Sequence, residues 1–280
     1  MSDVEKSPPP LLQVHLHLTE PAATERLAAW HLGPGLTALT RAGAITGWHF
    51  VRKGDRWRLR YQPATADSTD AATAAVDTVM EDFRTTGALS RWTPVIYEPE
   101  TIAFGGDDAM EAAHRLFHLD SHHTLAYLRA VHASEVDDQR RELSLLLGTA
   151  MMRGAGLDWY EIGDTWAKIA QHRPTVPETD GGRRLHQTVA VLLQADTGPT
   201  SALLTTGQLA FAAPWFAAFT ACGRGLRTLA DSGRLRRGLR AVLAHHQLFH
   251  SNRLGLTHDH QALLAHAATA TVLEPTQEPA

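Results

Sequence analysis

The stretch ITGWHFVRKGDRWRLRYQ, residues 45–62, decides the fold of the first part of the chain. Residues 45–52 and 56–62 each place aromatic and branched apolar side chains among polar ones, and such short runs are typical of β-strands. The Lys-Gly-Asp sequence at 53–55 separates the two runs, and residues of this kind are typical of tight turns. The stretch therefore predicts a β-hairpin.

The segments on either side of this hairpin predict a βαββαβ order. Residues 11–18, LLQVHLHL, alternate apolar and polar side chains as a half-buried strand does. The other expected elements are a helix over 22–42 broken at Gly33-Pro34-Gly35, a helix over 70–86 with Asp70 as its N-cap, and a strand over 92–100. This order of elements is typical of a ferredoxin-like lobe.

The rest of the chain has helical periodicity only, from 107 to about 270. Within it, DWYEIGDTW predicts a helix that starts at Asp158 and packs its tryptophans inward. We therefore predict an α+β fold with a cleft between its two lobes. The expected organisation is a single domain over 11–272, made of an α+β lobe (11–104) and a helical lobe (107–272), with disordered tails at 1–10 and 273–280.

The composition is that of a soluble globular protein and excludes several function classes. The 280 residues are 44% hydrophobic and 20% charged, and the formal net charge of −4 gives no general attraction to nucleic acid. One cysteine, Cys222, excludes an internal disulfide and a cysteine-rich metal site. Membrane-span and signal-peptide patterns are absent, as are phosphate loops, GxGxxG turns and nucleophile elbows. We expect a cytoplasmic protein with no nucleic-acid or membrane partner.

Arginines gather around the predicted hairpin: Arg52, Arg56, Arg58 and Arg60. The last three alternate along one strand, so their side chains point to the same face. Asp55 and Glu98 could neutralise them, which would make this an exposed, salt-bridged sheet face. The alternative is recognition of a carboxylate, which the planar fork of arginine binds through two hydrogen bonds. The spacing alone leaves both interpretations open.

Histidines form two further groups at helical spacing: His114, His118 and His122, and His245, His246 and His250. The first group could bind a metal, but no carboxylate stands between two of its members as in HExxH. The second group lies in HHQLFHSNRLGL (245–256), and histidine is the side chain best suited to proton transfer near neutral pH. A purely structural role is the alternative for both groups.

Three motifs in this order resemble a known family. They are FVRKGDRWRLR (50–60), YEPETIAFGG followed by AMEAAHRLFHLDS (97–121), and FHSNRLGL (249–256). Together they resemble the glutamate-elimination domain that forms the C-terminal part of class I lanthipeptide dehydratases. That domain also occurs as separate thiopeptide-type bacteriocin biosynthesis proteins. The resemblance extends from about residue 11 to 272.

The resemblance implies an enzyme that removes glutamate from glutamylated serine or threonine of a precursor peptide. The product is dehydroalanine or dehydrobutyrine. Arg58 and Arg60 match the arginine pair of the family and are assigned glutamate binding, and His250 matches its proton-transfer histidine. Further expected substrate contacts are Arg52, Arg56, Arg115, Asn252 and Arg253. No metal or organic cofactor is implied.

Two positions depart from the pattern of the family. Ala103 stands where elimination enzymes carry an arginine, two residues before the paired glycines, and Trp57 stands where a histidine is common. Arg52, Arg56 or Arg115 could supply the missing charge. Ala103 also points toward the pyridine synthases of thiopeptide pathways, which share the fold and join two dehydroalanines by a formal aza-[4+2] cycloaddition with release of the leader peptide.

A third interpretation is a non-catalytic subunit that binds the leader peptide at a sheet edge. The expected partners are a precursor peptide with its leader, a separate dehydratase subunit that glutamylates it, and a second copy of the chain in a homodimer. Activity after replacement of Arg58 and His250 separates the enzyme from the binding subunit.

Overall fold

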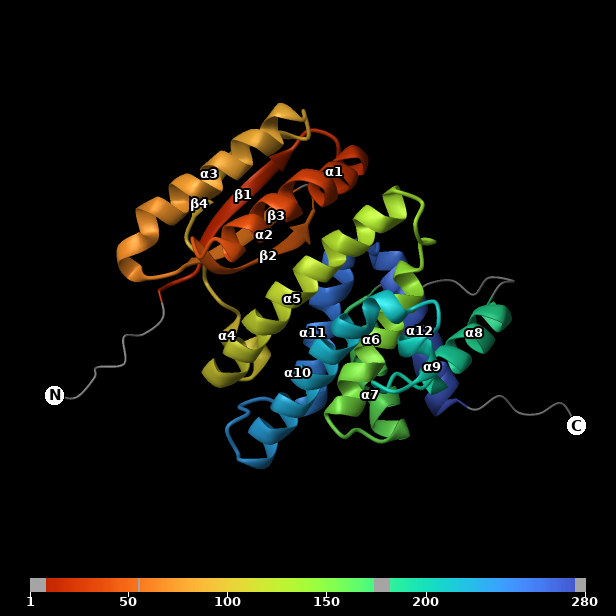
Figure 1. Cartoon of the computed structure of the whole chain (residues 1–280). Coiled ribbons are helices and arrows are strands. Elements are labelled where there is room, and N and C mark those ends of the chain that lie inside the picture. Colours follow the sequence, from red (N-terminus) through yellow and green to blue (C-terminus); the bar gives the residue numbers. More distant parts are fainter. Residues whose placement is uncertain (1–8, 55, 174–181, 275–280) are drawn as a thin grey trace, which may run out of the picture. The chain divides into compact units, whose positions relative to one another are not determined.

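The protein is described by a computed structural model over residues 9–54, 56–173 and 182–274 (Figure 1). The chain forms two compact units. Unit 1 contains the chain up to Glu98 together with Ser121–Asp137, and unit 2 contains Pro99–Asp120 and the chain from Asp138 onward. The turn residue Asp55 and most of the two expected tails lie outside the described residues.

Unit 1 contains the predicted four-stranded sheet. Its strands are β1 (Leu12–Leu18), β2 (Ile45–Lys53), β3 (Arg56–Pro63) and β4 (Leu89–Val95). They lie in the order β2-β3-β1-β4 with antiparallel neighbours, which is the ferredoxin-like arrangement. Val14, Leu16, Trp57 and Leu59 are buried in the core of this unit. The prediction of a hairpin at 45–62 and of a βαββαβ lobe is therefore confirmed.

The first helical segment of unit 1 corrects one expectation. It consists of α1 (Pro21–Leu27), a π-helical turn η1 (Ala28–Leu32) and α2 (Gly33–Arg41), without the break expected at Gly33-Pro34-Gly35. Proline lacks an N–H and crowds the preceding turn of an α-helix, and Pro34 lies in the first turn of α2, directly after the π-helical turn. The chain therefore remains helical through the glycines.

Two other boundaries differ from the expectation. Helix α3 (Thr69–Thr85) begins after a short 3-10 turn, η2 (Ala66–Ser68), so Ser68 is its N-cap residue and Asp70 lies in its first turn. Strand β4 ends at Val95 instead of residue 100, because its one partner strand ends nearby, where Gln13 pairs with Val95.

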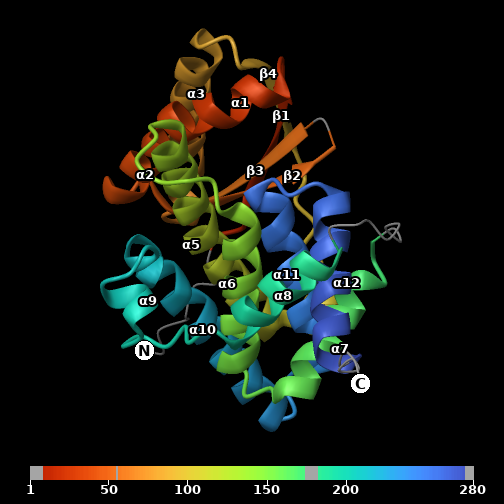
Figure 2. The same cartoon turned by 90° about the vertical axis from the view of Figure 1, so that its right-hand side faces the viewer.

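Unit 2 is helical, as the periodicity predicts. Its helices are α4 (Thr101–Phe104), the first half of α5 (Asp107–His132), α6 (Arg140–Gly154), α7 (Trp159–Ala170), α8 (Gly182–Gln194), α9 (Ala202–Thr205), α10 (Ala213–Asp231), α11 (Leu239–Leu254) and α12 (His258–Leu273), with a 3-10 turn η3 (Ala210–Ala212). Helix α6 contacts α7, α8, α10, α11 and α12 (Figure 2). No helix in the described ranges is long and apolar enough to cross a membrane.

Helix α7 begins as predicted. The side chain of Asp158 accepts a hydrogen bond from the backbone N–H of Glu161 at 2.8 Å, and Glu161 accepts one in return from the backbone N–H of Asp158 at 3.1 Å. Trp166 is buried, whereas Trp159 is only partly buried and Tyr160 is exposed. The inward packing of the tryptophans is therefore correct for Trp166 and partly correct for Trp159.

Glycines allow α6 and α10 to approach closely. A Cβ atom on Gly223 would lie 2.0 Å from the carbonyl oxygen of Met151, and one on Gly154 would lie 2.5 Å from that of Thr220. Both contacts are to backbone atoms, which a change of side-chain rotamer cannot relieve. The packing of these two helices therefore requires glycine at both positions.

Substitution of two glycines in α10 tests this packing. Gly223→Ala should lower the free energy of unfolding by about 2 kcal/mol or more, because the two helices must separate. Gly225→Ala is the matched control: no atom lies within 4 Å of its added Cβ, and alanine favours the helix by about 0.5–1 kcal/mol. Urea unfolding of both variants measures the difference, and equal stabilities would contradict the close approach.

Candidate active site

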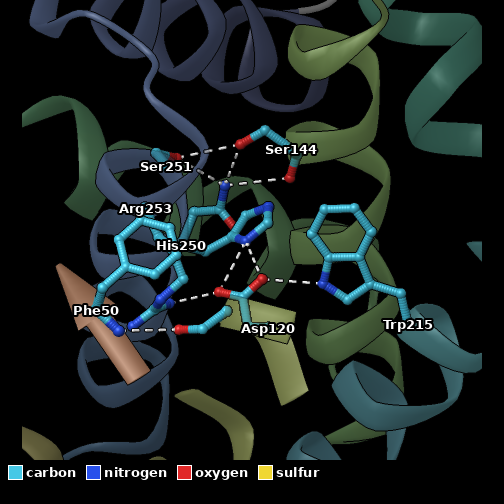
Figure 3. A network of polar contacts seen from close by, with 9 residues as sticks. Phe50, Asp120, Ser144, Trp215, His250, Ser251 and Arg253 are labelled. Atoms are coloured by element: carbon cyan, nitrogen blue, oxygen red, sulfur yellow. Dashed lines mark hydrogen bonds and ion pairs between the residues drawn. The ribbon is translucent and has the colours of Figure 1, made fainter. Parts of the chain in front are cut away.

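Two buried residues of unit 2, Asp120 in α5 and His250 in α11, form a hydrogen-bonded pair (Figure 3). The Nδ1 atom of His250 lies 2.9 Å from Oδ1 and 3.1 Å from Oδ2 of Asp120. Because an ionised carboxylate only accepts hydrogen bonds, Nδ1 carries a proton in this arrangement. Nε2 is then the ring nitrogen that is available for proton transfer.

Two further donors keep Asp120 ionised. Arg253 donates from Nη1 to Oδ2 at 2.5 Å, and the indole N–H of Trp215 donates to Oδ1 at 2.9 Å. Burial acts to raise the pKa of Asp120, but its electrostatic interactions with His250 and Arg253 and the hydrogen bonds from His250 and Trp215 outweigh it and lower the pKa. The carboxylate is therefore negatively charged at neutral pH.

The Nε2 atom of His250 is buried and has no hydrogen-bond partner in the part of the chain that the structure describes. The rings of Trp215 and Phe219 lie edge-on to the imidazole, with centroids 5.8 and 4.8 Å away. An imidazole that is held in one orientation by a carboxylate, and whose other nitrogen makes no hydrogen bond, has the arrangement of a general base. Because the side chain of His250 is 1% exposed, a substrate can reach this nitrogen only if neighbouring side chains move.

A polar network of three side chains links α11 to α6 (Figure 3). The amide nitrogen of Gln247 donates to the hydroxyl of Ser144 at 3.0 Å and to that of Ser251 at 3.2 Å, and the two hydroxyls lie 3.1 Å apart. Gly148 makes room for this amide, since a Cβ there would lie 2.2 Å from Oε1 of Gln247. The network fixes the helix that carries His250.

In unit 1, Arg60 is the most buried arginine of the sheet face. Its Nε atom donates to Oε1 of Gln13 at 2.6 Å, its Nη1 atom lies 3.5 Å from the imidazole of His49, and its guanidinium lies 4.5 Å from the ring centroid of Tyr97. These contacts hold the side chain in one orientation. Arg60 is therefore a fixed cation on this face.

Arg58 is half-buried and Arg56 is exposed, and both lie on the same face as Arg60. Arg58 pairs in register with His15 of β1. The pKa of His15 is lowered, chiefly by partial burial and next by the positive charges of Arg58 and Arg56. This face of the sheet therefore disfavours a further positive charge and suits an anion.

Arg52 lies on the opposite face of the sheet from these arginines. Lys53 pairs with Arg56 across the turn, so Arg52 is opposite Trp57, and its guanidinium lies 4.6 Å from that ring. Arg52 also forms an ion pair of 2.6 Å with Glu25 of α1. These contacts hold the Arg52 side chain against Trp57 and α1 within unit 1.

The other expected substrate contacts are spread over unit 2. Arg253 is buried beside Asp120, and its guanidinium lies 4.8 Å from the ring centroid of Phe117. Arg115 is exposed and lies 3.8 Å from Glu111, and the side-chain oxygen of Asn252 accepts a hydrogen bond from Gln261 at 2.9 Å. Arg253 is thus the one residue of this group that contacts the Asp120–His250 pair.

Two arrangements suggested by the sequence are not found among the described residues. One is an ion pair between Glu98 and the arginines of the sheet face, and the other is a metal site. Glu98 is exposed and forms no ion pair with the arginines of the sheet face there. No group of three or more histidine, cysteine, aspartate or glutamate side chains in the described ranges could hold a metal ion. Within the series that begins at His114, His122 instead contacts the hydroxyl of Thr37 at 3.4 Å.

A guanidinium group does lie beside Ala103, although the residue itself carries no charge. Arg237, in the segment between α10 and α11, donates from Nη1 to the carbonyl oxygen of Ala103. The sequence motif that contains Ala103 gives no sign of this contact, because the two residues are far apart along the chain. Arg237 therefore supplies a positive charge near the position where the resemblance implies an arginine.

His246 is a second buried histidine of α11, and both of its ring nitrogens lack a hydrogen-bond partner among the described residues. Its ring lies edge-on to Phe104, with centroids 4.9 Å apart. Burial, followed by the charges of His245 and Arg253, lowers the pKa of His246 to about 3. His246 is therefore neutral at pH 7 and lies in an apolar environment.

Comparison with known proteins identifies the family. The profile described as "Lantibiotic biosynthesis dehydratase C-term" matches residues 12–273. The chain belongs to this family. No protein of curated function matches the sequence.

Three solved structures have the fold of this family member. The tRNA dependent lantibiotic dehydratase MibB from Microbispora sp. 107891 has a TM-score of 0.72 at 16% identity, and the match covers 98% of this chain and 29% of MibB. The chain thus spans less than a third of that dehydratase. TsrL has a TM-score of 0.57 at 14% identity and coverages of 96% and 99%. TbtD, a pyridine synthase from thiomuracin biosynthesis, has a TM-score of 0.56 at 13% identity and coverages of 95% and 98%.

Removal of the Asp120 charge should destabilise this family member. Asp120→Asn removes the charge of the carboxylate that pairs with the buried Arg253, and the expected loss is about 3 kcal/mol. Asp138→Asn, at an exposed carboxylate 2.9 Å from Arg140, is the matched control and should change the stability by about 0.5 kcal/mol or less. Urea unfolding at pH 7 measures both, and an effect at Asp120 no larger than that at Asp138 would contradict the buried network.

The low pKa of His246 predicts a pH-dependent stability term. Between its ordinary value of 6.5 and about 3, only the unfolded state takes up a proton on His246, so stability falls as the pH is lowered through this range. At pH 5 the loss relative to pH 7 is about 2 kcal/mol. The variant His246→Leu lacks this term, so its stability relative to the wild type should rise by that amount between pH 7 and pH 5. A difference independent of pH would contradict the assignment.

Proposed function

We propose that this protein is an enzyme of ribosomal-peptide natural product biosynthesis that eliminates glutamate from glutamylated serine or threonine residues. The observation that carries the proposal is the Asp120–His250 pair, which orients an imidazole so that its Nε2 atom has no hydrogen-bond partner among the described residues. Membership of the lantibiotic dehydratase C-terminal family supports a precursor peptide as the substrate.

In the proposed reaction, Nε2 of His250 takes the Cα proton of the glutamylated residue. The electron pair of the broken C–H bond forms the Cα–Cβ double bond, the Cβ–O bond breaks, and glutamate leaves as a carboxylate. The peptide product is dehydroalanine or dehydrobutyrine. Asp120 acts as a positioning residue, because it sets the tautomer of His250 and stabilises the imidazolium that forms.

The arginines of the sheet face support the same reaction. Negative charge develops on the departing carboxylate, and fixed cations beside it lower the energy of the transition state. Arg60 is held by Gln13 and His49 and therefore needs little reorganisation. Arg58 is half-buried, so part of its side chain is accessible to a ligand.

The proposed reaction also implies its partners. A separate dehydratase subunit must supply the glutamylated peptide, and we place the reaction in the cytoplasm, where ribosomal precursor peptides are made. A homodimer is part of the proposal as well. Its test is the molar mass of the purified protein, measured by light scattering.

A pyridine synthase is the second candidate. The observation that favours it is Ala103, since the arginine expected there in an elimination enzyme is absent and a cycloaddition needs no complete set of glutamate-binding arginines. Arg58, Arg60 and His250, which match the elimination residues of the family, point the other way. We therefore rank elimination first.

Mass spectrometry of the protein incubated with two peptides tests the proposal. One peptide is the glutamylated precursor, and the other already contains two dehydroalanines. Loss of glutamate from the first peptide is the expected result. Release of the leader with a new aromatic absorbance from the second would favour the pyridine synthase. Binding of both peptides without any change would support a leader-binding subunit and overturn the enzyme.

Variants assign the roles within the same assay. His250→Ala should lower the elimination rate by roughly 100-fold or more, as expected for loss of a general base. Arg58→Gln should lower it roughly ten- to hundred-fold, as expected for loss of a charge-assisted hydrogen bond. The matched controls are His246→Leu and Arg84→Gln, an exposed arginine of α3 paired with Glu81, and both should keep the wild-type rate. A wild-type elimination rate in His250→Ala would contradict the role of His250 as the general base.

A further inference from the structure

Unit 2 contains a pocket of about 990 Å³ next to α4, the segment before α11 and the middle of α11. Its charged, histidine and larger apolar lining residues are Glu100, Ile102, His172, Arg173, Arg236, Arg237, His245 and Leu248. Arg173 already donates a hydrogen bond to the side-chain oxygen of Gln261 at 2.9 Å. The pocket therefore combines three guanidinium groups, two imidazoles and one carboxylate with an apolar surface.

Arg236 and Arg237 both have N–H groups that can donate hydrogen bonds to a ligand. Arg236 is exposed and forms no ion pair among the described residues. Arg237 is half-buried, and its hydrogen bond to the carbonyl oxygen of Ala103 uses one of the five N–H groups of a guanidinium. That bond also fixes the position of the side chain at the wall of the pocket.

The paired glycines Gly105 and Gly106 hold these arginines in place. Both have positive φ angles, +95° and +110°, and the carbonyl oxygen of Gly105 accepts a hydrogen bond of 2.7 Å from the backbone N–H of Arg236. A Cβ on Gly105 would lie 2.7 Å from the side chain of Leu235, and one on Gly106 would lie 3.3 Å from that of Arg236. The glycine pair thus lets the segment before α11 approach α4.

Two other features indicate the kind of ligand. Nε2 of His245 lies 3.1 Å from the carboxylate of Glu100, so the wall of the pocket already binds a carboxylate of the chain itself. Ile102 is 90% exposed and lines the pocket beside the guanidinium groups, so it offers an apolar surface to a ligand bound there. The pocket therefore suits a carboxylate with an apolar neighbour.

We propose that this pocket binds an acidic segment of a peptide, with a glutamate or aspartate carboxylate on Arg236 and Arg237 and an adjacent apolar side chain on Ile102 and Leu248. Guanidinium groups bind carboxylates through paired, charge-assisted hydrogen bonds. The inference relies on the proposed function only in taking a peptide as the ligand. The bound carboxylate is that of an amino-acid side chain in the peptide and is separate from the glutamate that leaves.

Binding of two labelled synthetic peptides to the full chain tests the inference by fluorescence polarisation. In one peptide glutamate alternates with leucine, and in the other glutamine replaces each glutamate. The glutamate peptide should bind roughly ten-fold tighter or more, and added salt should reduce the preference. Equal binding of the two peptides, or no binding of either, would overturn the proposal.

Variants locate the binding. Arg236→Gln combined with Arg237→Gln should abolish the preference for the glutamate peptide. Arg240→Gln, which removes an exposed arginine that pairs with Asp164 outside the pocket, should keep it. Ile102→Glu, at a position too exposed to affect folding, should weaken the glutamate peptide selectively by like-charge repulsion. If the double variant keeps the preference for the glutamate peptide, or if Arg240→Gln loses it equally, the peptide does not bind in this pocket.

The same peptides separate this inference from the proposed reaction. His250→Ala should lose elimination but bind the glutamate peptide as the wild type does. If the glutamate preference persists in the double variant while His250→Ala loses turnover, the pocket is wrong and the reaction stands. If the double variant loses the preference but no elimination occurs with any variant or the wild type, the reaction is wrong and the pocket stands.

Discussion

The buried carboxylate of Asp120 is the constraint on which unit 2 depends. An ionised carboxylate inside a protein is strongly unfavourable unless charged or polar partners surround it. Here His250, Arg253 and Trp215 all donate to it, and these residues come from α11 and α10, while Asp120 comes from α5 (Figure 3). One carboxylate therefore fixes three helices relative to one another.

The same constraint determines which ring nitrogen of His250 donates a hydrogen bond to Asp120. A histidine free in solution can carry its proton on either ring nitrogen, whereas His250 must donate from Nδ1 to satisfy Asp120. The polar contacts of Gln247 with Ser144 and Ser251 hold α11 in position one turn away. In the proposed function, the stability of unit 2 and proton transfer by His250 would thus rest on the same interaction.

The sequence predicts the local parts of this fold well. Alternation around the hairpin and helical periodicity beyond residue 107 depend on neighbouring residues, and both are present in the structure. The helical spacing of His250 and Arg253 places both on one face, so their proximity follows from the motif. Asp120 and Trp215 lie far away along the chain. Asp120 falls within the second motif of the resemblance, but that motif does not indicate a contact with His250, and Trp215 lies in none of the three motifs. Tertiary packing alone brings them together.

The register of the hairpin determines on which side of the sheet Arg52 lies. Grouping it with Arg58 and Arg60 by proximity in the sequence ignores the register of the hairpin, in which Lys53 pairs with Arg56. That register places Arg52 beside Trp57 and Glu25, on the other side of the sheet. The contact of Arg237 with Ala103 and the π-helical turn before Gly33 are likewise products of packing and were not predictable from local patterns.

The protonation state of His250 is the most direct test of this account. Nitrogen-15 NMR of the full chain with labelled histidine identifies the signals of His250 as those that His250→Ala lacks. The account predicts, at neutral pH, a protonated Nδ1 and an unprotonated Nε2. A protonated Nε2 under the same conditions would contradict it, because no nitrogen would then be available to accept the proton of the substrate.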